Sequence, residues 1–370
     1  MSAIISSFTV ERFRSLQSLK LENLGRVNLI TGRNNCGKSS VLEALRILAS
    51  AGRPEVLYSI LQAREEDSAG NENTNERELN YFGSFFNGFP QIPERGQTVV
   101  LSADRGKQCL RLALSVGWFS EERDPEGLPR WVEQQPSIFP MFEGVPALII
   151  ESQAGRRVRP LAQMKGLPNS RYYGSDLADE PPLPLIFVSP YGGEHTANLG
   201  ALWDSVALSD RETDVINALK IVAGDITKVS MIGGEASRKR RTAIVRSSEF
   251  PNPVPLRSYG DGLNRLFGIV LSLVNAKDGF LLIDEFENGM HHTVQLDVWR
   301  IIFRLARQLN TQVFATSHSW DAIESFQQAA AEEPDEALLI RLSKHEGSIV
   351  PTLFRKDELA IVTRNHIEVR

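Results

Sequence analysis

Short apolar runs open the chain, and a helical pattern follows them. Apolar residues alternate with polar ones over residues 5–10 and 19–21, which predicts two strands that pair as a hairpin. The run Arg26–Thr31 (RVNLIT) is typical of a short buried strand, and a glycine follows it. From Ser39 to Ala51 apolar residues recur at helical spacing. The opening unit is therefore a strand, a glycine-bearing loop and a helix.

The middle of the chain has a different pattern. Residues 64–80 are polar and rich in turn-forming residues, which is typical of an exposed loop or linker. Two β-like runs follow within residues 97–119, and residues 147–152 (ALIIES) predict another strand. Residues 153–184 are interpreted as loop and end in PPLP. This middle region is predicted to be mostly β.

Strands and helices alternate again towards the C-terminus. In chain order the pattern predicts a strand at 184–190, helix at 199–222, a hairpin from 228–234 and 242–248, a helix at 263–274, a strand at 280–283, a helix at 293–309, a strand at 312–316, strands at 337–342 and 349–354, and a short closing helix. Alternation at both ends of the chain indicates the α/β class. The β-rich middle indicates a second lobe inserted between those ends.

Composition narrows the class of protein. Of the 370 residues, 42% are hydrophobic and 24% charged, as in a folded globular chain. A net charge of −5 argues against a uniformly basic nucleic-acid coat. Two cysteines, Cys36 and Cys109, are too few for a secreted disulfide scaffold. The apolar stretch 267–274 is far shorter than the roughly 20 residues of a membrane span, and the opening MSAIISSFTVERFR lacks signal-peptide character. We expect a cytoplasmic protein that does not cross a membrane.

A phosphate-binding loop is the first chemical motif. Gly32–Ser39 (GRNNCGKS) matches G-x-x-x-x-G-K-[ST]. The glycines let backbone N–H groups turn towards phosphates, and the following helix adds its positive N-terminal end. Lys38 can reach the β- and γ-phosphates, and Ser39 can ligate Mg²⁺. A chance glycine-rich turn is the alternative, but the placement between a strand and a helix favours the phosphate loop.

Two later strands end in residues suited to hydrolysis. The strand 280–283 is followed by Asp284, expected near Mg²⁺, and Glu285, expected to act as general base on the attacking water. An acidic turn after a strand is common, and the upstream phosphate loop favours the catalytic interpretation. The run 312–318 ends in His318, which can hydrogen-bond a γ-phosphate. A lone histidine is usually a surface or packed residue, but its position one helix and one strand after the acidic pair favours a role in the site.

The order of these motifs resembles the head of ABC-type ATPases. It is most similar to the RecF, SMC and OLD-type branch, and especially to short bacterial ABC-type ATPases often linked to phage defence. Arg12–Ser15 (RFRS) is similar to the N-F-R-S turn of that branch, with its Asn replaced. Arg257–Gly262 (RSYGDG) is similar to the signature, with Ser258 and Gly260 kept and Tyr259 in place of the first glycine. Glu287–His291 (ENGMH) is similar to E-N-G-L-H.

The resemblance implies a fold and a set of site residues. The fold is α/β: one ABC-type P-loop ATPase head over 1–370, with an antiparallel β lobe and an inserted lobe at 56–184. The implied cofactors are ATP and Mg²⁺, with Ser39 and Asp284 at the metal and Lys38, Glu285 and His318 as catalytic residues. The implied nucleotide-binding residues are Gly32, Asn34, Asn35, Cys36, Gly37, Lys38, Ser39, Ser40, Ser258, Gly260 and Asn288.

The resemblance also implies that two copies share each site. Ser258 and Gly260 of one copy would touch the γ-phosphate held by Lys38 of the other. ATP would close the pair, and hydrolysis would open it. Asn288 would lie at the seam. The first partner is therefore a second copy of the chain, in a homodimer or a higher even oligomer.

Spacing separates the functional alternatives. Lys38 and Ser258 are 258 − 38 = 220 residues apart, more than expected of a transporter subunit, and the segment after the acidic pair is EFEN rather than EPTS. An SMC protein would carry long coiled coils, and an OLD nuclease a TOPRIM domain after the histidine, where 370 − 318 = 52 residues remain. The first hypothesis is an ATPase switch that controls a separate nuclease or toxin in anti-phage defence. The second is a RecF-like, ATP-gated DNA repair protein, and a transporter subunit ranks third.

Three further features have competing interpretations. Arg238–Arg241 (RKRR) is either a nucleic-acid contact or a solvated hairpin tip. His291 and His292 are adjacent, so they point in different directions on a helix, and we interpret them as seam residues rather than a metal pair. Cys36 occupies a variable position of the phosphate loop, where a redox role is disfavoured.

Overall fold

The computed structural model describes most of the chain. The described residues are 3–64, 82–90, 97–123, 129–134, 144–161, 182–190, 195–233, 241–333, 335–355, 358–359 and 361.

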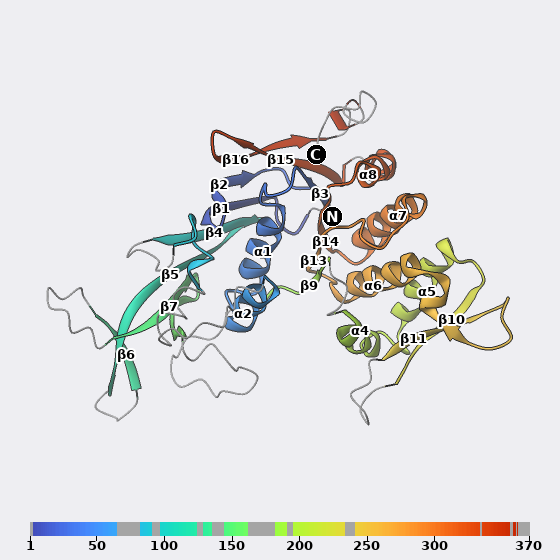
Figure 1. Ribbon diagram of the computed structural model, residues 1–370, viewed down its shortest axis with the longest axis horizontal. Coiled ribbons are helices and arrows are strands. Elements are labelled where there is room, and N and C mark those ends of the chain that lie inside the picture. Colours follow the sequence, from blue (N-terminus) through green and yellow to red (C-terminus); the bar gives the residue numbers. More distant parts are fainter. Residues whose placement is uncertain are drawn as a thin grey trace.

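A mixed, mainly parallel sheet forms the centre of the molecule (Figure 1). Its order is β16-β15-β3-β14-β13-β9, and all neighbours are parallel except β16, which is antiparallel to β15. The inner strands are continuous apolar runs because both faces of this sheet are covered. The strand predictions for this sheet are confirmed. The strands are β3 (Val27–Thr31), β9 (Leu185–Val188), β13 (Phe280–Ile283), β14 (Gln312–Thr316), β15 (Ala337–His345) and β16 (Ser348–Phe354).

Different helices cover the two faces of this sheet. Successive strand residues point to opposite faces, so Leu281 and Ile283 pack into one core and Phe280 and Leu282 into another. The first core includes α6 (Asp261–Asn275), α7 (His292–Gln308) and α8 (Trp320–Glu332), and it continues into the smaller lobe described below. The second core holds α1 (Lys38–Ala49) and an antiparallel sheet. Helices α1, α6 and α7 match the sequence predictions, whereas α8 was not predicted.

The antiparallel sheet joins the N-terminal hairpin to the middle of the chain. Strand β1 pairs with β2 on one side and with β4 on the other, where Val10 faces Leu101. The order continues through β5, β7 and β8, and β6 also pairs with β5. The strands are β1 (Ser7–Phe13), β2 (Leu16–Leu21), β4 (Thr98–Arg105), β5 (Gln108–Arg123), β6 (Pro129–Glu133), β7 (Val145–Ser152) and β8 (Gly155–Pro160).

The strands contributed by residues 56–184 thus extend the sheet that β1 and β2 begin. The loop interpretation of 153–184 is wrong for β8, because GRRVRP completes a ladder with β7 despite its three arginines. Whether 56–184 acts as a lobe of its own stays a prediction. The expected loop at 64–80 falls almost entirely outside the described residues.

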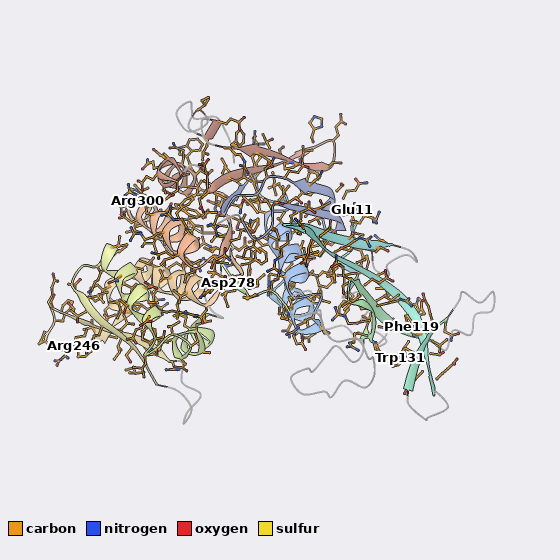
Figure 2. The ribbon with its side chains drawn as sticks, turned by 180° about the vertical axis from the view of Figure 1, so that it is seen from behind. Glu11, Phe119, Trp131, Arg246, Asp278 and Arg300 are labelled. Carbon is orange, nitrogen blue, oxygen red and sulfur yellow. The ribbon has the colours of Figure 1, made fainter. Side chains whose placement is uncertain are left out.

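A smaller lobe of helices and a short sheet lies beside α6, at the end of the molecule opposite β5 and β6 (Figure 1). It contains α4 (His195–Asp204), α5 (Asp210–Val222) and a sheet of β10 (Ile226–Ile232), β11 (Thr242–Ser247) and β12 (Val254–Pro255). The single helix predicted at 199–222 is two helices, because the chain turns at Leu208, which has a φ of 64° and is 99% exposed. Figure 2 shows Arg246 of this lobe at the opposite extremity from Phe119 and Trp131.

The structure tests some of the remaining sequence predictions, and others fall outside the described residues. The predicted hairpin of β10 and β11 is confirmed. In the basic tip, Arg238–Arg240 lie outside the described residues, while Arg241 pairs with Asp204 at 2.6 Å. The expected closing helix falls largely outside the described residues too. None of the helices in the described part of the chain is long and apolar enough to cross a membrane.

Candidate nucleotide site

The phosphate loop joins β3 to α1, and at two of its positions only glycine fits. Gly32 and Gly37 have φ values of 141° and 84°. A Cβ atom on Gly32 would lie 2.3 Å from the Leu342 carbonyl oxygen, and one on Gly37 would lie 2.9 Å from a Leu16 methyl. A side chain at either position would therefore clash with a neighbouring strand.

Burial raises the pKa of the Cys36 thiol, which is the opposite of thiolate activation.

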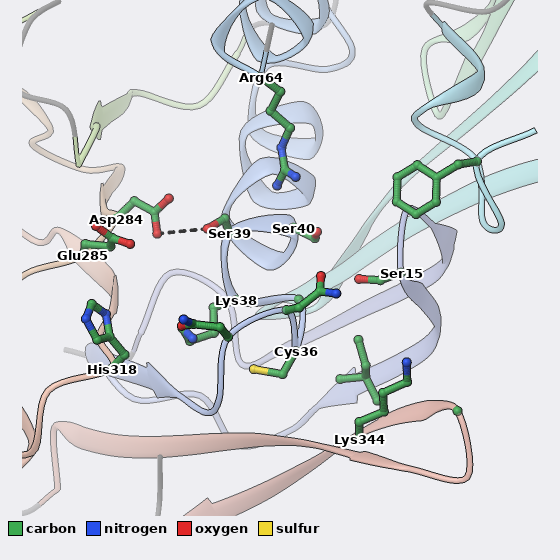
Figure 3. Close-up of a pocket in the computed structure, with 16 residues that line it drawn as sticks. Ser15, Cys36, Lys38, Ser39, Ser40, Arg64, Asp284, Glu285, His318 and Lys344 are labelled. Atoms are coloured by element: carbon green, nitrogen blue, oxygen red, sulfur yellow. Dashed lines mark hydrogen bonds between the residues drawn. The ribbon is translucent and has the colours of Figure 1, made fainter. Parts of the chain in front are cut away.

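Lys38 and Ser39 begin α1 and turn their polar ends inward. The Lys38 ammonium donates to the carbonyl oxygens of Gly32 (2.7 Å) and Arg33 (3.0 Å). The Ser39 hydroxyl donates to Asp284 Oδ1 at 3.2 Å, which links the loop to the end of β13 (Figure 3). This contact joins residues 245 positions apart in the chain.

The acidic pair at the end of β13 is held in place by Thr316, a residue to which the sequence motifs assign no role. The buried Thr316 hydroxyl at the end of β14 donates to Asp284 Oδ1 (2.5 Å) and accepts from the Glu285 backbone N–H (2.9 Å). Glu285 has a φ of 49°, an uncommon conformation for this residue type. The Thr316 hydroxyl thus orients the Asp284 carboxylate and also holds the backbone of Glu285.

Two further side chains orient the expected catalytic residues. Asn288 donates to Glu285 Oε2 at 2.5 Å within the same chain. Glu287 accepts from the backbone N–H groups of His318 (3.0 Å) and Ser319 (3.1 Å), and its Oε1 lies 3.2 Å from His318 Nδ1. The Glu287 side chain is mostly buried, whereas that of His318 is half exposed. Glu287 was noted in the sequence only as part of a motif, without a role.

Arg265 of α6 lies beneath this cluster. Its guanidinium donates to the carbonyl oxygens of Ser189 (3.1 Å), Glu285 (3.4 Å) and Asp284 (3.5 Å). Burial lowers the pKa of Arg265, and the charge of Glu287 is the main opposing influence. The sequence carried no signal for this contact, which depends on how α6 packs under β13.

A cavity of about 510 Å³ collects most of the predicted site (Figure 3). Gly32 forms the first turn of the loop and is not part of the lining. Ser258, Gly260 and Asn288 are also absent from it. Ser258 and Gly260 lie exposed where the short helix η2 (Leu256–Tyr259) meets α6. The predicted residues that line the cavity are Asn34, Asn35, Cys36, Gly37, Lys38, Ser39, Ser40, Asp284, Glu285 and His318.

A second cavity of about 680 Å³ adjoins the first across Ser39 and the acidic pair. Glu43 lies in its wall, and the guanidiniums of Arg14 (2.7 Å) and Arg64 (2.6 Å) pair with it. Arg64, at the end of α2 (Pro54–Ala63), lines both cavities. Burial raises the pKa of Glu43, against the opposing effect of the two arginines. Neither α2 nor this ionic cluster was predicted.

The residues around Asp284 fit the magnesium ion expected from the sequence. Hard oxygen donors, a hydroxyl and a carboxylate, already meet at Ser39 and Asp284, and such donors suit Mg²⁺. Within the described residues there is no cluster of three or more histidine, cysteine or acidic side chains of the kind that holds a metal without help from a substrate. His291 caps α7, and its ring lies 4.2 Å from that of His292, so the two adjacent side chains lie close together and do not point apart as expected.

Comparison with known proteins identifies the family. The family described as "AAA domain, putative AbiEii toxin, Type IV TA system" matches residues 27–323, well over half of the chain. The chain belongs to this family. Because an AAA domain is an ATPase domain, the expected enzyme class, an ATPase, is confirmed by this membership.

Relatives and solved structures agree with that assignment. An uncharacterised protein of Methanocaldococcus jannaschii is 50% identical over 48 residues, which are 13% of this chain and 22% of that protein. A Helicobacter pylori protein named "ATP/GTP phosphatase" is 22% identical over 98% of both chains. The SMC head bound to the C-terminal winged-helix domain of ScpA has a TM-score of 0.53 at 10% identity, with 96% of this chain and 99% of that chain covered. The family match and this shared fold confirm the expected ABC-type, SMC-like ATPase head. The roles of individual site residues stay predictions.

Proposed function

We propose that ATP hydrolysis by this protein drives a switch between separate and paired copies, and that the switch controls a separate effector protein. One observation carries the proposal. The phosphate loop, the acidic pair and His318 share one cavity, whereas Ser258 and Gly260 lie exposed elsewhere on the same chain. A second copy, placed head to tail, can bring its signature segment to the triphosphate.

The chain's own residues account for the chemical step. Lys38 leaves the carbonyl oxygens of its loop and binds the β- and γ-phosphates. Glu285, oriented by Asn288, takes a proton from the attacking water as the water oxygen bonds to the γ-phosphorus. The bond from that phosphorus to the bridging oxygen breaks, and ADP leaves with the electron pair. Ser39 and Asp284 would hold Mg²⁺, which supplies positive charge against the phosphates.

The switch follows from where the contacts form. ATP touches the signature only in the paired state, so it stabilises that state by its differential affinity. Once the γ-phosphate leaves, the bridge between copies is lost and the pair opens. Hydrolysis in such a system sets the lifetime of the paired state.

Known proteins support control of a separate effector. The family description names a toxin of a toxin–antitoxin system and so supports the defence setting, while the H. pylori relative, named an ATP/GTP phosphatase, supports the hydrolysis step. The SMC head was crystallised with a domain of a second protein, ScpA, so a head of this fold can bind a partner chain. We propose a nuclease or toxin as the effector, and anti-phage defence in the cytoplasm as the setting.

The decisive experiment uses full-length Glu285→Gln with ATP and Mg²⁺. Removal of the general base should stop turnover while ATP stays bound, so light scattering should report a dimer or a higher even oligomer. The double variant Glu285→Gln/Ser258→Arg is the matched control and should stay unpaired. Glu285→Gln that turns over ATP at the wild-type rate, or that stays single with ATP bound, would contradict the model.

The same variant can identify the effector. Expressed with its neighbouring genes and purified with ATP, it should retain a second protein that leaves when ATP is omitted. If it instead retains DNA, with an affinity that falls steeply with salt, the RecF-like alternative is favoured over effector control.

A further inference from the structure

The cavity extends beyond the phosphate loop, away from the acidic pair. A Cβ atom on Gly37 would lie 3.1 Å from an Ile349 methyl and 3.4 Å from the Ser15 hydroxyl, so those residues adjoin the loop directly. Figure 3 shows Asp284, Glu285 and His318 on one side of Lys38, with Ser15 and Lys344 on the other. The cavity therefore has an acidic end and a second, distinct end.

The acidic end fixes the direction of a bound nucleotide. The γ-phosphate must lie near Glu285, because the attacking water is activated there. A nucleoside triphosphate is long and narrow, so its sugar and base must lie towards the other end, beyond Gly37.

Phe89 is the aromatic residue at that end. Its side chain lines the cavity and is 53% exposed, and its φ is 52°. Hydrogen bonds hold the turn that presents it: Phe89 N–H donates to the Phe86 carbonyl (3.1 Å), and the Asn87 side chain donates to the Arg14 carbonyl (2.7 Å). Phe86 is fully buried and bridges to Phe13 of β1. The backbone of the turn that carries this exposed ring is thus held in place at the cavity wall.

The tip of the β15–β16 hairpin faces the same space. Lys344 is exposed and lines the cavity together with Gly347 and Ile349. Gly347 has a φ of 86°, which gives the tight turn between the two strands. A positive charge and an apolar side chain thus line the same cavity as Phe89.

We propose that Phe89 and the β15–β16 hairpin tip form the base-binding subsite of the nucleotide cavity and select purines. The base stacks on the Phe89 ring, and Lys344 donates to purine N7. Adenine and guanine both carry N7 as an acceptor, whereas pyrimidines lack it and offer less surface for stacking. The subsite therefore takes ATP and GTP alike. This inference rests on the proposed function, because the phosphate loop must fix the direction of the ligand.

The test separates the base from the phosphates by comparing ATP with inorganic tripolyphosphate, each with Mg²⁺. Phe89→Leu keeps an apolar side chain but removes the aromatic face. Its Kd for ATP should rise about tenfold to a hundredfold, as expected for a lost base–aromatic stack. Its Kd for tripolyphosphate should stay at the wild-type value. Phe89→Trp should bind ATP at least as well as wild type.

Further variants complete the test. Lys344→Met should weaken ATP and GTP binding by a similar factor and leave 7-deaza-ATP, which lacks N7, unaffected. Phe250→Leu removes another half-exposed aromatic ring, on the smaller lobe and outside the cavity lining, and should leave the Kd of the single chain for ATP and for tripolyphosphate unchanged. Wild-type ATP affinity in Phe89→Leu, or equal affinity of wild type for ATP and CTP, would overturn the subsite. If Lys38→Ala instead bound both ATP and tripolyphosphate with the wild-type Kd, the phosphate-loop assignment would be wrong, and with it the proposed function.

Discussion

The phosphate-loop cavity and the signature segment differ in how completely their polar groups are arranged within one chain. Around the cavity, side chains at the ends of β13 and β14 and at the start of α1 already contact one another, as in the pairs Ser39–Asp284 and Thr316–Asp284. In the signature segment, Ser258 and Gly260 are exposed at the start of α6. The first region is built to hold a ligand by itself, and the second presents a surface. Under the proposed function, this difference means that one copy suffices to bind ATP, whereas turnover needs the signature segment of a second copy.

The largest expected effect comes from a substitution in the exposed signature segment alone. Ser258→Arg should abolish steady-state ATP hydrolysis because a bulky charge blocks the approach of the second copy. The Kd for ATP of the single chain should change less than about threefold, since Ser258 does not line the cavity. Turnover and equilibrium binding measured on the same sample provide the check.

Mixing two inactive variants sharpens this prediction. Ser258→Arg retains Lys38, and Lys38→Ala retains Ser258, so a mixed pair holds one complete site. An equimolar mixture should regain measurable activity that neither variant shows alone. If the mixture stays inactive although both variants fold and mixed pairs form, the two halves do not come from different copies.

A smaller effect is expected within the cavity itself. Thr316→Val keeps the shape of the side chain but removes the donor to Asp284 and the acceptor for the Glu285 N–H. Loss of this hydroxyl should lower kcat about tenfold or more and destabilise the fold by about 1–3 kcal/mol. ATP affinity should be nearly unchanged, because the phosphate loop is intact.

Thr311→Val is the matched control for that experiment. Thr311 is also fully buried, just before β14, and its hydroxyl donates to the Ala276 carbonyl, away from the site. It should lose similar stability and keep kcat. An equal loss of kcat in both variants would mean that Thr316 acts only through stability.

The smallest expected effect concerns the support of the signature segment. Tyr259 and Ser247 both donate to the Asp225 carboxylate, and these hydrogen bonds lower the pKa of Asp225 from its ordinary value of 3.8. A lowered pKa in the folded state means that this carboxylate stabilises the fold above about pH 4 and loses that effect as the pH falls through the lowered pKa. Tyr259→Phe should reduce Tm slightly and slow pairing a few-fold.

The pH dependence distinguishes this role from mere packing. The difference in Tm between wild type and Tyr259→Phe should be largest above pH 4 and shrink at lower pH. The same comparison in an Asp225→Asn background should give a difference that does not change with pH. A constant difference in both backgrounds would show that Tyr259 acts through packing alone.

Local patterns allowed much of this fold and site to be predicted. The glycine spacing of the phosphate loop and the apolar run before Asp284 lie within short stretches, so β3, α1 and β13 could be placed. Thr316 could not be given a role, because that role depends on register: Ile283 faces Ala315 in β14, which brings Thr316 beside the acidic pair. Arg265 depends on the packing of a helix and is equally invisible in a local pattern.

Missed elements had two different causes. Strand β8 was interpreted as loop because its arginines hide the alternation, yet Arg157 is buried and donates to the Ala51 carbonyl. That acceptor comes from a part of the same chain 106 residues away, so the local sequence does not reveal it. Helix α8 did carry a local signal, since Ala322, Ile323 and Phe326 recur at helical spacing and are buried.

The central position of β3 has a consequence for the newly made protein. Strand β3 lies between β14 and β15, so its neighbours are Gln312–Thr316 and Ala337–His345. A ribosome that has just made the phosphate loop must add about 275 further residues before the first neighbour, β14, is complete, and about 300 before the second, β15. Contacts this distant in sequence form late. A nascent chain stalled before these strands should be unable to bind nucleotide and should depend on chaperones that shield its exposed apolar strand.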